Sequence, residues 1–284
     1  MEESARISFF SKKSTKCPAC GAEFNKEELL TGRGRLIAGN LTDELRRIYE
    51  PSPKFGDVYP LIYPVTVCPQ CLYSAFMMDF PEPPKGVTEA VQDHRDERVQ
   101  ALESIFPVLD FRDTRGLEQG IASYALAISC YDFFPDESTP VIRQGISALR
   151  AAWLCGDLHR KYPGENYDYL SELFYRKARF FYNLAVRYDQ DGTQNLSLAG
   201  NLGPDLDKNY GYDGLLYLSA LLEFRYGTGD QGEVRAKNLE YAKRALAKIF
   251  GMGKASKKKP SAILDKAKDL YNTISDELKE EAGG

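Results

Sequence analysis

Two cysteine motifs organise this sequence, Cys17-Pro18-Ala19-Cys20-Gly21 near the N-terminus and Cys68-Pro69-Gln70-Cys71 further along. In each motif two residues separate the cysteines, so one tight turn can present both thiolates at about 2.3 Å from a Zn²⁺ ion. A single pair would also suit a thioredoxin-like redox site, but two pairs in one chain favour metal binding. Four thiolates complete a tetrahedral sphere and leave no position for water. We therefore predict one structural zinc ion, bound by Cys17, Cys20, Cys68 and Cys71.

The composition is that of a globular chain. It has 284 residues, 43% of them hydrophobic, and a formal net charge of −4 at pH 7. This charge argues against sequence-independent binding of phosphates, which strongly basic proteins favour, although it leaves nucleic acid open as a partner. The N-terminal stretch opens with acidic residues and carries only the short apolar piece Ile7–Phe10, too little for a secretory signal. No segment approaches the roughly 18 apolar residues of a membrane helix. We expect a cytoplasmic protein without a membrane partner.

The remaining cysteines, Cys130 and Cys155, lie singly within apolar patterns of helical period. In a reducing compartment, paired CxxC motifs are metal ligands more readily than disulfides. A single cysteine on a helix usually packs as a small apolar side chain. We therefore expect Cys130 and Cys155 to be buried and without a chemical role.

The first part of the chain, residues 1–84, predicts a zinc-ribbon-like β module. Arg6–Phe10 has strand character, and the β-branched and aromatic run Leu61–Val67 predicts a strand that leads directly into Cys68. The long insert between the two cysteine motifs must leave the metal site and return. Within it, Thr42–Tyr49 predicts a short helix, capped by Thr42 and with acidic residues in its first turn.

A proline-rich linker at Phe80–Gly86 separates this module from a helical region. Apolar residues then recur at helical spacing, which predicts antiparallel helical hairpins over residues 85–256. The predicted helices span roughly 88–106, 115–134, 140–162, 165–188, 213–226 and 232–250. Lys257–Lys259 predicts a solvated hinge, and residues 257–284 an amphipathic helix that packs on the helical domain. The fold class predicted from the sequence is thus mainly α.

Together these features resemble two known patterns. The run from Gly214 to Tyr226, followed by the helix to Phe250, looks like a tetratricopeptide-type hairpin, although no full repeat signature recurs at a fixed period. An N-terminal CPxCG, a later CPxC and a helical C-terminal region resemble the bacterial domain-of-unknown-function 2225 family. Because that family is uncharacterised, the resemblance implies a bacterial origin and metal binding, and it implies no enzyme activity.

Two groups of side chains are candidates for binding a partner. Basic residues in the insert could contact phosphates, but neighbouring acidic residues nearly balance them, which favours a solvated mixed-charge surface. Tyrosines of the helix near 165–188 could line a peptide-binding face, but they recur on more than one side of the helix, which favours core packing. The candidates are Arg33, Arg35, Arg46, Arg47, Tyr167, Tyr175 and Tyr182.

The loop at 189–212 carries a pattern that resembles a Ca²⁺ site. Oxygen-bearing side chains alternate there, namely Asp205, Asp207, Asn209 and Asp213. An EF-hand loop needs Gly at its sixth position and Glu at its twelfth, where this chain has Tyr210 and Leu216. Turn formation and helix capping therefore explain the pattern more simply.

The sequence favours a non-enzymatic protein, because no catalytic constellation is present and its two histidines, His94 and His159, lie in charged contexts. We expect a zinc-stabilised scaffold or adaptor that binds a protein or peptide partner through a helical-repeat surface. The alternative is a zinc-ribbon regulator that binds nucleic acid through the insert. An enzyme of novel type that uses the loop at 189–213 is a third, weaker hypothesis.

Overall fold

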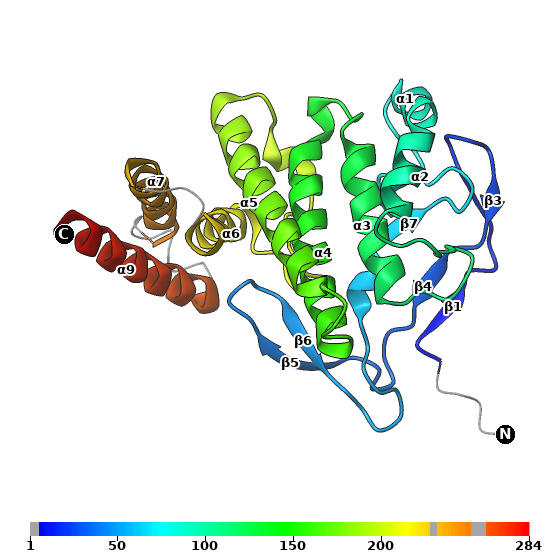
Figure 1. Cartoon of the computed structure of the whole chain (residues 1–284), viewed down its shortest axis with the longest axis horizontal. Coiled ribbons are helices and arrows are strands. Elements are labelled where there is room, and N and C mark those ends of the chain that lie inside the picture. Colours follow the sequence, from blue (N-terminus) through cyan, green and yellow to red (C-terminus); the bar gives the residue numbers. More distant parts are fainter. Residues whose placement is uncertain (1–5, 228–231, 251–259, 284) are drawn as a thin grey trace.

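The computed structural model describes residues 6–227, 232–250 and 260–283. Most of the described chain is helical, and short antiparallel strand pairs precede the helices (Figure 1). The predicted class, mainly α with a small β module at the N-terminus, is confirmed.

The strands within the described residues pair two by two. The pairs are β1 (Ser8–Phe10) with β4 (Glu27–Leu29), β2 (Thr15–Lys16) with β3 (Glu23–Phe24), β5 (Ile37–Leu41) with β6 (Arg47–Glu50), and β7 (Val65–Val67) with β8 (Ser74–Phe76). The first cysteine motif forms the turn between β2 and β3, and the second forms the turn between β7 and β8. Each motif is therefore the tip of a small hairpin.

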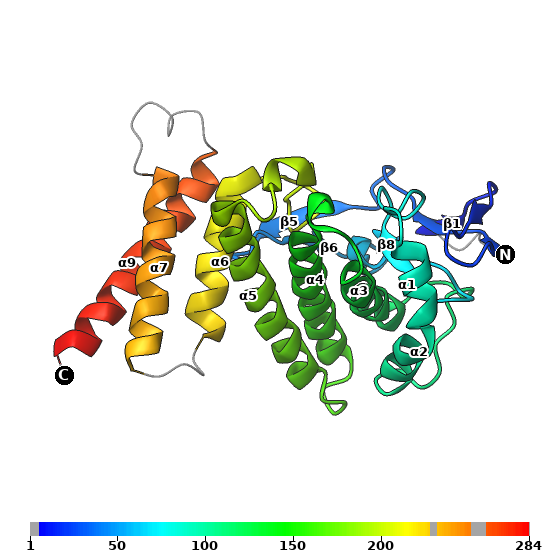
Figure 2. The ribbon, with the colours of Figure 1, turned by 90° about the horizontal axis from the view of Figure 1, so that it is seen from above.

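Helices account for the rest of the regular structure. They are α1 (Val87–Asp93), α2 (Arg95–Glu103), α3 (Leu117–Tyr131), α4 (Pro140–Lys161), α5 (Tyr167–Asp191), α6 (Gly211–Tyr226), α7 (Glu233–Phe250) and α9 (Ser261–Gly283), with short 3₁₀ turns η1 (Pro60–Ile62), η2 (Asp136–Ser138) and η3 (Leu196–Ala199). From α3 onward each helix packs against the next described helix, so the helices form a row (Figure 2). We call α3 to α9 the helical array.

Local sequence explains where several helices begin and end. Pro140 occupies the first turn of α4, where its missing N–H costs no hydrogen bond. Gly192, at φ 81°, ends α5 in the left-handed conformation that favours glycine. Most residues of α4 are buried, because α3 and α5 cover it on two sides. Cys130 and Cys155 are fully buried, as expected.

Side chains of the helical array hold the backbone of the second cysteine hairpin. The Tyr124 hydroxyl donates to the Leu61 carbonyl at 2.6 Å, and the Tyr131 hydroxyl accepts from the Phe76 N–H at 3.0 Å. Gly120 of α3 lets η1 approach closely, since a Cβ there would lie 2.7 Å from Cγ2 of Ile62. Residues 60–76 are therefore packed directly onto α3.

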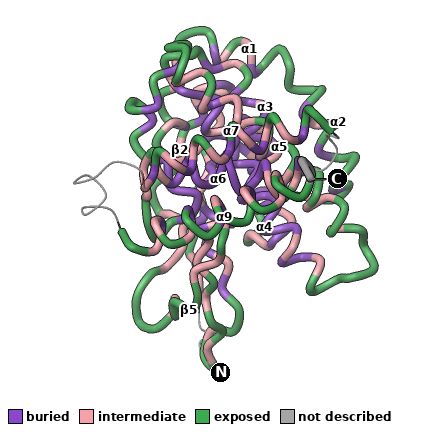
Figure 3. Tube along the Cα trace, turned by 90° about the vertical axis from the view of Figure 1, so that its left-hand side faces the viewer, coloured by how far each residue is buried: buried purple, intermediate pink, exposed green. Residues whose placement is uncertain are grey.

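Burial is distributed unevenly along the chain. The buried apolar residues form one continuous cluster from the cysteine motifs to α9. In residues 6–57, however, only four residues are buried: Cys17, Ala19, Glu27 and Leu45. Figure 3 shows the same contrast, with buried residues gathered among the helices and the segment around β5 largely exposed.

The helix predicted for Thr42–Tyr49 is wrong, because this stretch is the tip and second strand of the β5–β6 hairpin. The Thr42 hydroxyl accepts from the Arg46 N–H at 3.1 Å, and the Leu45 N–H donates to the Thr42 carbonyl at 3.1 Å. Leu45 takes a left-handed conformation, φ 60°, in this turn. A threonine followed by acids suits a tight turn as well as a helix start, and contacts with the helical array favour the turn.

Two other predicted elements are shorter than expected. The strand predicted for Leu61–Val67 is reduced to β7, because the 3₁₀ turn η1 precedes it. The single helix predicted for 88–106 is interrupted at His94, whose φ and ψ of −98° and 22° separate α1 from α2. Gly86, rather than Thr88, precedes the first turn.

Within the described part of the chain, no helix is both long and apolar enough to cross a bilayer. The hinge predicted for Lys257–Lys259 and the domain boundary predicted after residue 256 lie outside the described residues. The division predicted near residue 84 stays a prediction.

Candidate metal centre

The first cysteine hairpin forms a tight turn that two backbone hydrogen bonds close. The Cys17 N–H donates to the Ala22 carbonyl at 2.8 Å, and the Gly21 N–H donates to the Cys17 carbonyl at 2.9 Å. Gly21 has φ 77°, a conformation that costs glycine little. The sequence CPACG therefore folds locally so that both sulfurs lie on the same side of the turn.

The second cysteine hairpin repeats this geometry with a different residue. The Cys68 N–H donates to the Tyr73 carbonyl and the Leu72 N–H to the Cys68 carbonyl, both at 2.9 Å. Leu72 takes the place of Gly21 at φ 59°, which costs a residue with a side chain about 1–2 kcal/mol. Contacts around Leu72 must offset that cost.

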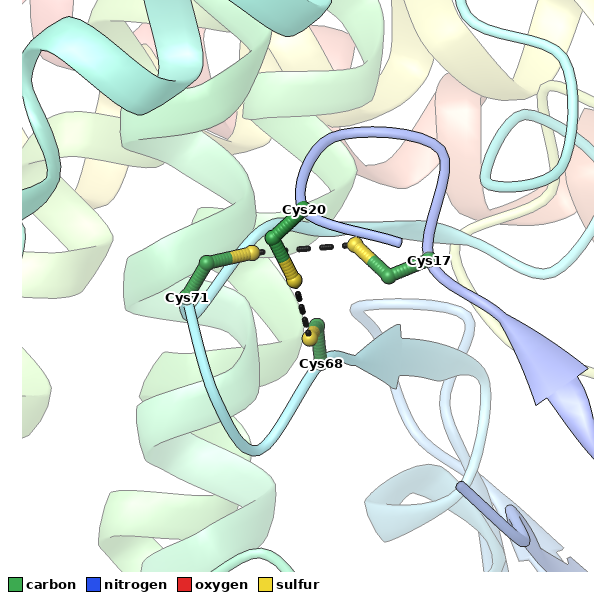
Figure 4. Close-up of side chains that lie close together, drawn as sticks. All are labelled: Cys17, Cys20, Cys68 and Cys71. Carbon is green, nitrogen blue, oxygen red and sulfur yellow. Dashed lines mark hydrogen bonds between the residues drawn. The ribbon is translucent and has the colours of Figure 1, made fainter. Parts of the chain in front are cut away.

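The two turns bring four sulfurs together (Figure 4). Sγ of Cys17 lies 3.6 Å from Sγ of Cys71, and Sγ of Cys20 lies 3.6 Å from Sγ of Cys68. All four sulfurs lie within 4.8 Å of one another, and the cysteines form no disulfide. A tetrahedral zinc ion with Zn–S bonds of about 2.3 Å needs sulfurs about 3.8 Å apart. The cluster therefore fits a metal ion of this kind, and the four cysteines are the only such group among the described residues.

The thiols of Cys17, Cys68 and Cys71 shift one another's pKa values. Hydrogen bonds with Cys17 and Cys71 lower the pKa of Cys68 to about 2, because they stabilise its thiolate. The hydrogen bond with Cys68 raises the pKa of Cys17 to about 12, and the hydrogen bond with Cys17 raises the pKa of Cys71 well above its ordinary value. A full set of four thiolates therefore requires a cation, and binding of that cation releases protons.

Side chains of α2 and α3 attach the second cysteine hairpin to the helices. Arg98 is buried, and its guanidinium donates to the carbonyls of Cys71 (3.3 Å) and Val91. Arg95 donates to the Gln70 carbonyl at 3.3 Å. The Cys130 thiol faces the Leu72 carbonyl at 3.9 Å, and burial raises its pKa to about 11.

The first cysteine hairpin has no comparable attachment. Among the described residues, its hydrogen bonds run within residues 14–24, apart from the sulfur contacts themselves. Phe24 adds one edge-to-face ring contact with Phe80, with centroids 6.0 Å apart. Apart from apolar contacts of Ala19, Ala22 and Phe24 with the core, the sulfur cluster is therefore the main link between the first hairpin and the rest of the molecule.

The candidate arginines do not form one basic face. Arg46 donates to the Asp157 carboxylate, with Nη1 3.1 Å from Oδ1, and Arg47 pairs with Asp207 at 2.7 Å. Arg35 donates to the Arg6 carbonyl and lies over the Phe55 ring. Arg33 is exposed in the turn before β5.

The candidate tyrosines occupy three different environments. Tyr182 is fully buried, as core packing requires, and therefore offers no surface to a partner. Tyr175 donates to the Glu44 carboxylate at 2.8 Å and stacks on Tyr226 with ring centroids 4.3 Å apart. Tyr167 is half-buried at the start of α5.

The oxygen-rich loop near α6 uses its side chains within the protein. Asp205 is buried and accepts from the N–H groups of Arg47 and Leu206, and burial raises its pKa. Asp207 binds Arg47, and the Asn209 side chain accepts from the Gly211 N–H at 2.8 Å. Asp213 lies in the first turn of α6. Turns and ion pairs thus account for the pattern at Asp205, Asp207 and Asn209.

Sequence reasoning missed Arg98 as a residue that supports the centre. It lies in a charged run, but it follows Val91 by seven residues and precedes Leu102 by four, so the three would share one face of the single helix predicted for 88–106. A charged residue on an apolar face is the signal that could have identified it.

The fold and the sulfur cluster define a class, a mainly helical protein with a four-cysteine centre of metal-binding geometry. The chain belongs to the family described as "Uncharacterized protein conserved in bacteria (DUF2225)", whose model matches residues 10–274. The resemblance drawn from the cysteine motifs is thereby confirmed. The chain is similar to an "Uncharacterized protein" from Borreliella burgdorferi, with 46% identity over 275 residues, 96% of this chain and 98% of that protein. No solved structure matches the chain.

Proposed function

We propose that this protein is a non-enzymatic adaptor, stabilised by one structural zinc ion, that binds a segment of a protein partner in the cytoplasm. Zinc suits the centre because its ligands are four cysteines with tetrahedral sulfur spacing. Four protein ligands leave no coordination position for a substrate. The ion would hold the first cysteine hairpin against the second.

A single observation carries the binding proposal, a cleft of about 1290 Å³ between the N-terminal strands and the helical array. Its walls are residues 6–13, residues 57–63, the start of α3 and the end of α4. Pockets for small molecules usually span about 300–1,000 Å³, so this cleft has room for a peptide segment.

The chemistry of the cleft suits a segment with apolar and acidic side chains. Phe9 and Phe10 are each 40% exposed, and Tyr162 is 52% exposed. Exposed aromatic residues in a concave site are typical of protein interfaces. The lining also carries more basic than acidic residues: Arg6, Lys12, Lys13, Arg115 and Lys161 against Glu27, Asp57 and Glu118.

The cleft offers little for catalysis. Neither His94 nor His159 lines it. Arg115 donates its guanidinium to the Ile62 and Val65 carbonyls, and its N–H to Glu27 at 2.7 Å, so these groups support the wall. These observations favour binding over chemistry.

The helical array supports an adaptor in a second way, because consecutive helices pack in a row as in helical-repeat proteins. We propose a degenerate relation to tetratricopeptide repeats. The lengths of α4 and α5, 22 and 25 residues, exceed what a repeat of about 34 residues can hold as a helix pair. Any repeat relation would therefore involve lengthened helices.

Binding of nucleic acid remains the second candidate. Arg46, Arg47, Arg160 and Lys161 line a smaller pocket of about 300 Å³. Arg46 and Arg160 both pair with Asp157, and Arg47 pairs with Asp207. Paired arginines contribute less to phosphate binding than free ones, which is why the adaptor is preferred.

Site-specific photo-crosslinking in cells tests the adaptor proposal. A crosslinking amino acid at Phe10 or Tyr162 should capture the same protein, and nuclease should not change the product. Phe180, 60% exposed on α5 and outside the cleft, is the matched control position. Nucleic acid captured by a crosslinking amino acid at position 47, in place of Arg47, would favour the regulator that binds nucleic acid. Identical products at Phe180 and Phe10 would contradict the cleft assignment.

A further inference from the structure

The tip of the β5–β6 hairpin, residues 42–46, lies against the helical array far away in sequence. Glu44 accepts three hydrogen bonds there: from Trp153 Nε1 on α4, from the Tyr175 hydroxyl on α5 at 2.8 Å, and from Arg225 on α6 at 3.1 Å. One carboxylate thus contacts three consecutive helices. The array thus binds the Glu44 side chain with three hydrogen-bond donors, as a binding site binds a ligand.

The residues on either side of Glu44 make equally specific contacts. Asp43 accepts from Arg225 at 3.0 Å and from Lys266 on α9 at 2.9 Å, and these two cations hold its pKa below the ordinary value. Leu45 is buried and lies against Gly214 of α6. Arg46 pairs with Asp157 of α4. We call the receiving residues Trp153, Asp157, Tyr175, Gly214, Arg225 and Lys266 the docking face.

The docking face is complementary to a turn with the order acid, acid, apolar, base. Two cations and two hydrogen-bond donors face the acids, Gly214 leaves room for the apolar residue, and Asp157 faces the base. None of these residues lines the cleft of the proposed function. The docking face is therefore a separate surface.

Besides these contacts, Arg47 of β6 donates its backbone N–H to Asp205 and pairs with Asp207 at 2.7 Å. The hairpin contributes little apolar surface to the attachment. Among residues 37–50, Leu45 alone is buried. The pairs of the tip differ in exposure. Asp43 is 59% exposed and Arg225 36% exposed, so their ion pair stabilises weakly and is screened by salt, whereas the Arg46–Asp157 pair is enclosed. Leu45 also occupies a left-handed conformation that a leucine disfavours. The attachment is thus specific in its chemistry and small in its apolar area.

We propose that the hairpin tip is a releasable ligand of the docking face, and that an acidic turn of a protein partner takes its place. The partner turn carries two adjacent acids, then an apolar residue and a basic residue. While the hairpin is docked it competes with the partner, so the apparent affinity falls in proportion to the fraction of open molecules. The inference goes beyond the proposed function, because it holds or fails independently of the cleft.

Trp153, the single tryptophan of the chain, reports the state of the docking face. It is buried, and Arg46 lies over its ring at 5.6 Å. The test uses the full chain loaded with zinc and carrying Asp43→Asn and Glu44→Gln, which keep side-chain shape and remove both charges. We expect the fluorescence of Trp153 to shift to the red, as it also should for the unaltered chain at high salt. An unchanged emission in both cases would show a permanent attachment and overturn the proposal.

A cyclised peptide of residues 37–50 represents the acidic turn of the partner, and it is titrated into the unaltered chain and into the double variant. It should bind the double variant about ten- to a hundredfold more tightly than the unaltered chain, and binding should reverse the red shift. Glu50→Gln, which removes one exposed charge at the far end of the same hairpin, should behave like the unaltered chain. Circular dichroism and metal content verify that the double variant is folded.

Two results of this titration would overturn the inference. Equal affinity of the peptide for the double variant and the unaltered chain would mean that the hairpin does not compete. A concentration-dependent dimer of the unaltered chain, with docked Trp153 emission, would assign the docking face to the hairpin of a second copy rather than to another protein.

Discussion

Two regions of this molecule are held together in different ways. In residues 6–57 four residues are buried, two of them Cys17 and Ala19 of the first cysteine motif, whereas most residues of α4 are buried. Burial of apolar surface stabilises a helical array by about 25 cal/mol per Å². The N-terminal region buries little such surface, so we propose that metal binding supplies part of its folding energy. We therefore expect loss of metal binding and unfolding of the helical array to be separate events.

The contrast also divides the metal centre itself. The second cysteine hairpin is bound by Arg98 of α2 and packed on α3, so part of its structure does not depend on the metal. The first cysteine hairpin is connected mainly through its sulfurs. Loss of the metal should therefore release the first hairpin more completely than the second.

The largest expected effect follows from removal of one ligand. Cys17→Ala should abolish stoichiometric metal binding, because structural zinc contributes about 10–16 kcal/mol in small zinc domains. Helical circular dichroism should remain nearly unchanged. Cys155→Ala is the matched control, a buried cysteine outside the centre that should leave one metal ion per chain. Metal analysis by mass spectrometry decides, and a Cys17→Ala protein that keeps its ion would refute the ligand assignment.

A cavity in the helical core should produce the opposite pattern. Leu149 of α4 is fully buried, so Leu149→Ala should lower the free energy of unfolding by about 2–5 kcal/mol. Metal stoichiometry at room temperature should stay at one. Thermal unfolding followed by circular dichroism measures the loss. Fewer than one metal ion per folded chain of the Leu149→Ala variant would show that a change in the core disturbs the metal centre, so that the two regions are not separable.

The smallest expected effect concerns the packing of η1, which precedes the second cysteine hairpin, on the helical array. A Cβ at Gly120 would lie within 3.0 Å of Ile62 and Leu154, so Gly120→Ala should cost about 1–3 kcal/mol through overpacking. Gly156→Ala in α4 is the control, since a Cβ there would lie 4.0 Å from Oγ of Ser171 and alanine favours helices. Denaturant unfolding compares the two. Equal stability of both variants would argue against close packing of η1 on α3.

The elements predicted correctly from the sequence are those set by local chemistry. Gly21 after CPAC predicts its own left-handed turn, and the proline at 140 predicts the start of α4. Thr42–Tyr49 forms the tip and second strand of the β5–β6 hairpin instead of the predicted helix, because its conformation depends on distant partners. Arg46 meets Asp157 across 111 positions of the chain. No periodicity or spacing carries such information.

The aromatic residues of α5 make the same point on one helix. Tyr182 and Tyr175 are separated by two turns, yet one is enclosed in the core and the other binds Glu44 of the hairpin tip. The sequence favoured core packing for both. Seven residues apart, the two tyrosines share one face of α5, and the tertiary arrangement decides which neighbour covers each turn of that face. The second environment therefore could not be predicted.

Hydrogen exchange of the metal-loaded full chain, measured before and after chelation, tests the central claim most directly. We expect residues 8–29, including the amides of Cys17 and Gly21, to lose protection on chelation, while α3 to α6 keep theirs. Protection that is unchanged in residues 8–29, or lost equally in α3 to α6, would contradict a metal centre that holds the N-terminal region onto an independently stable helical array.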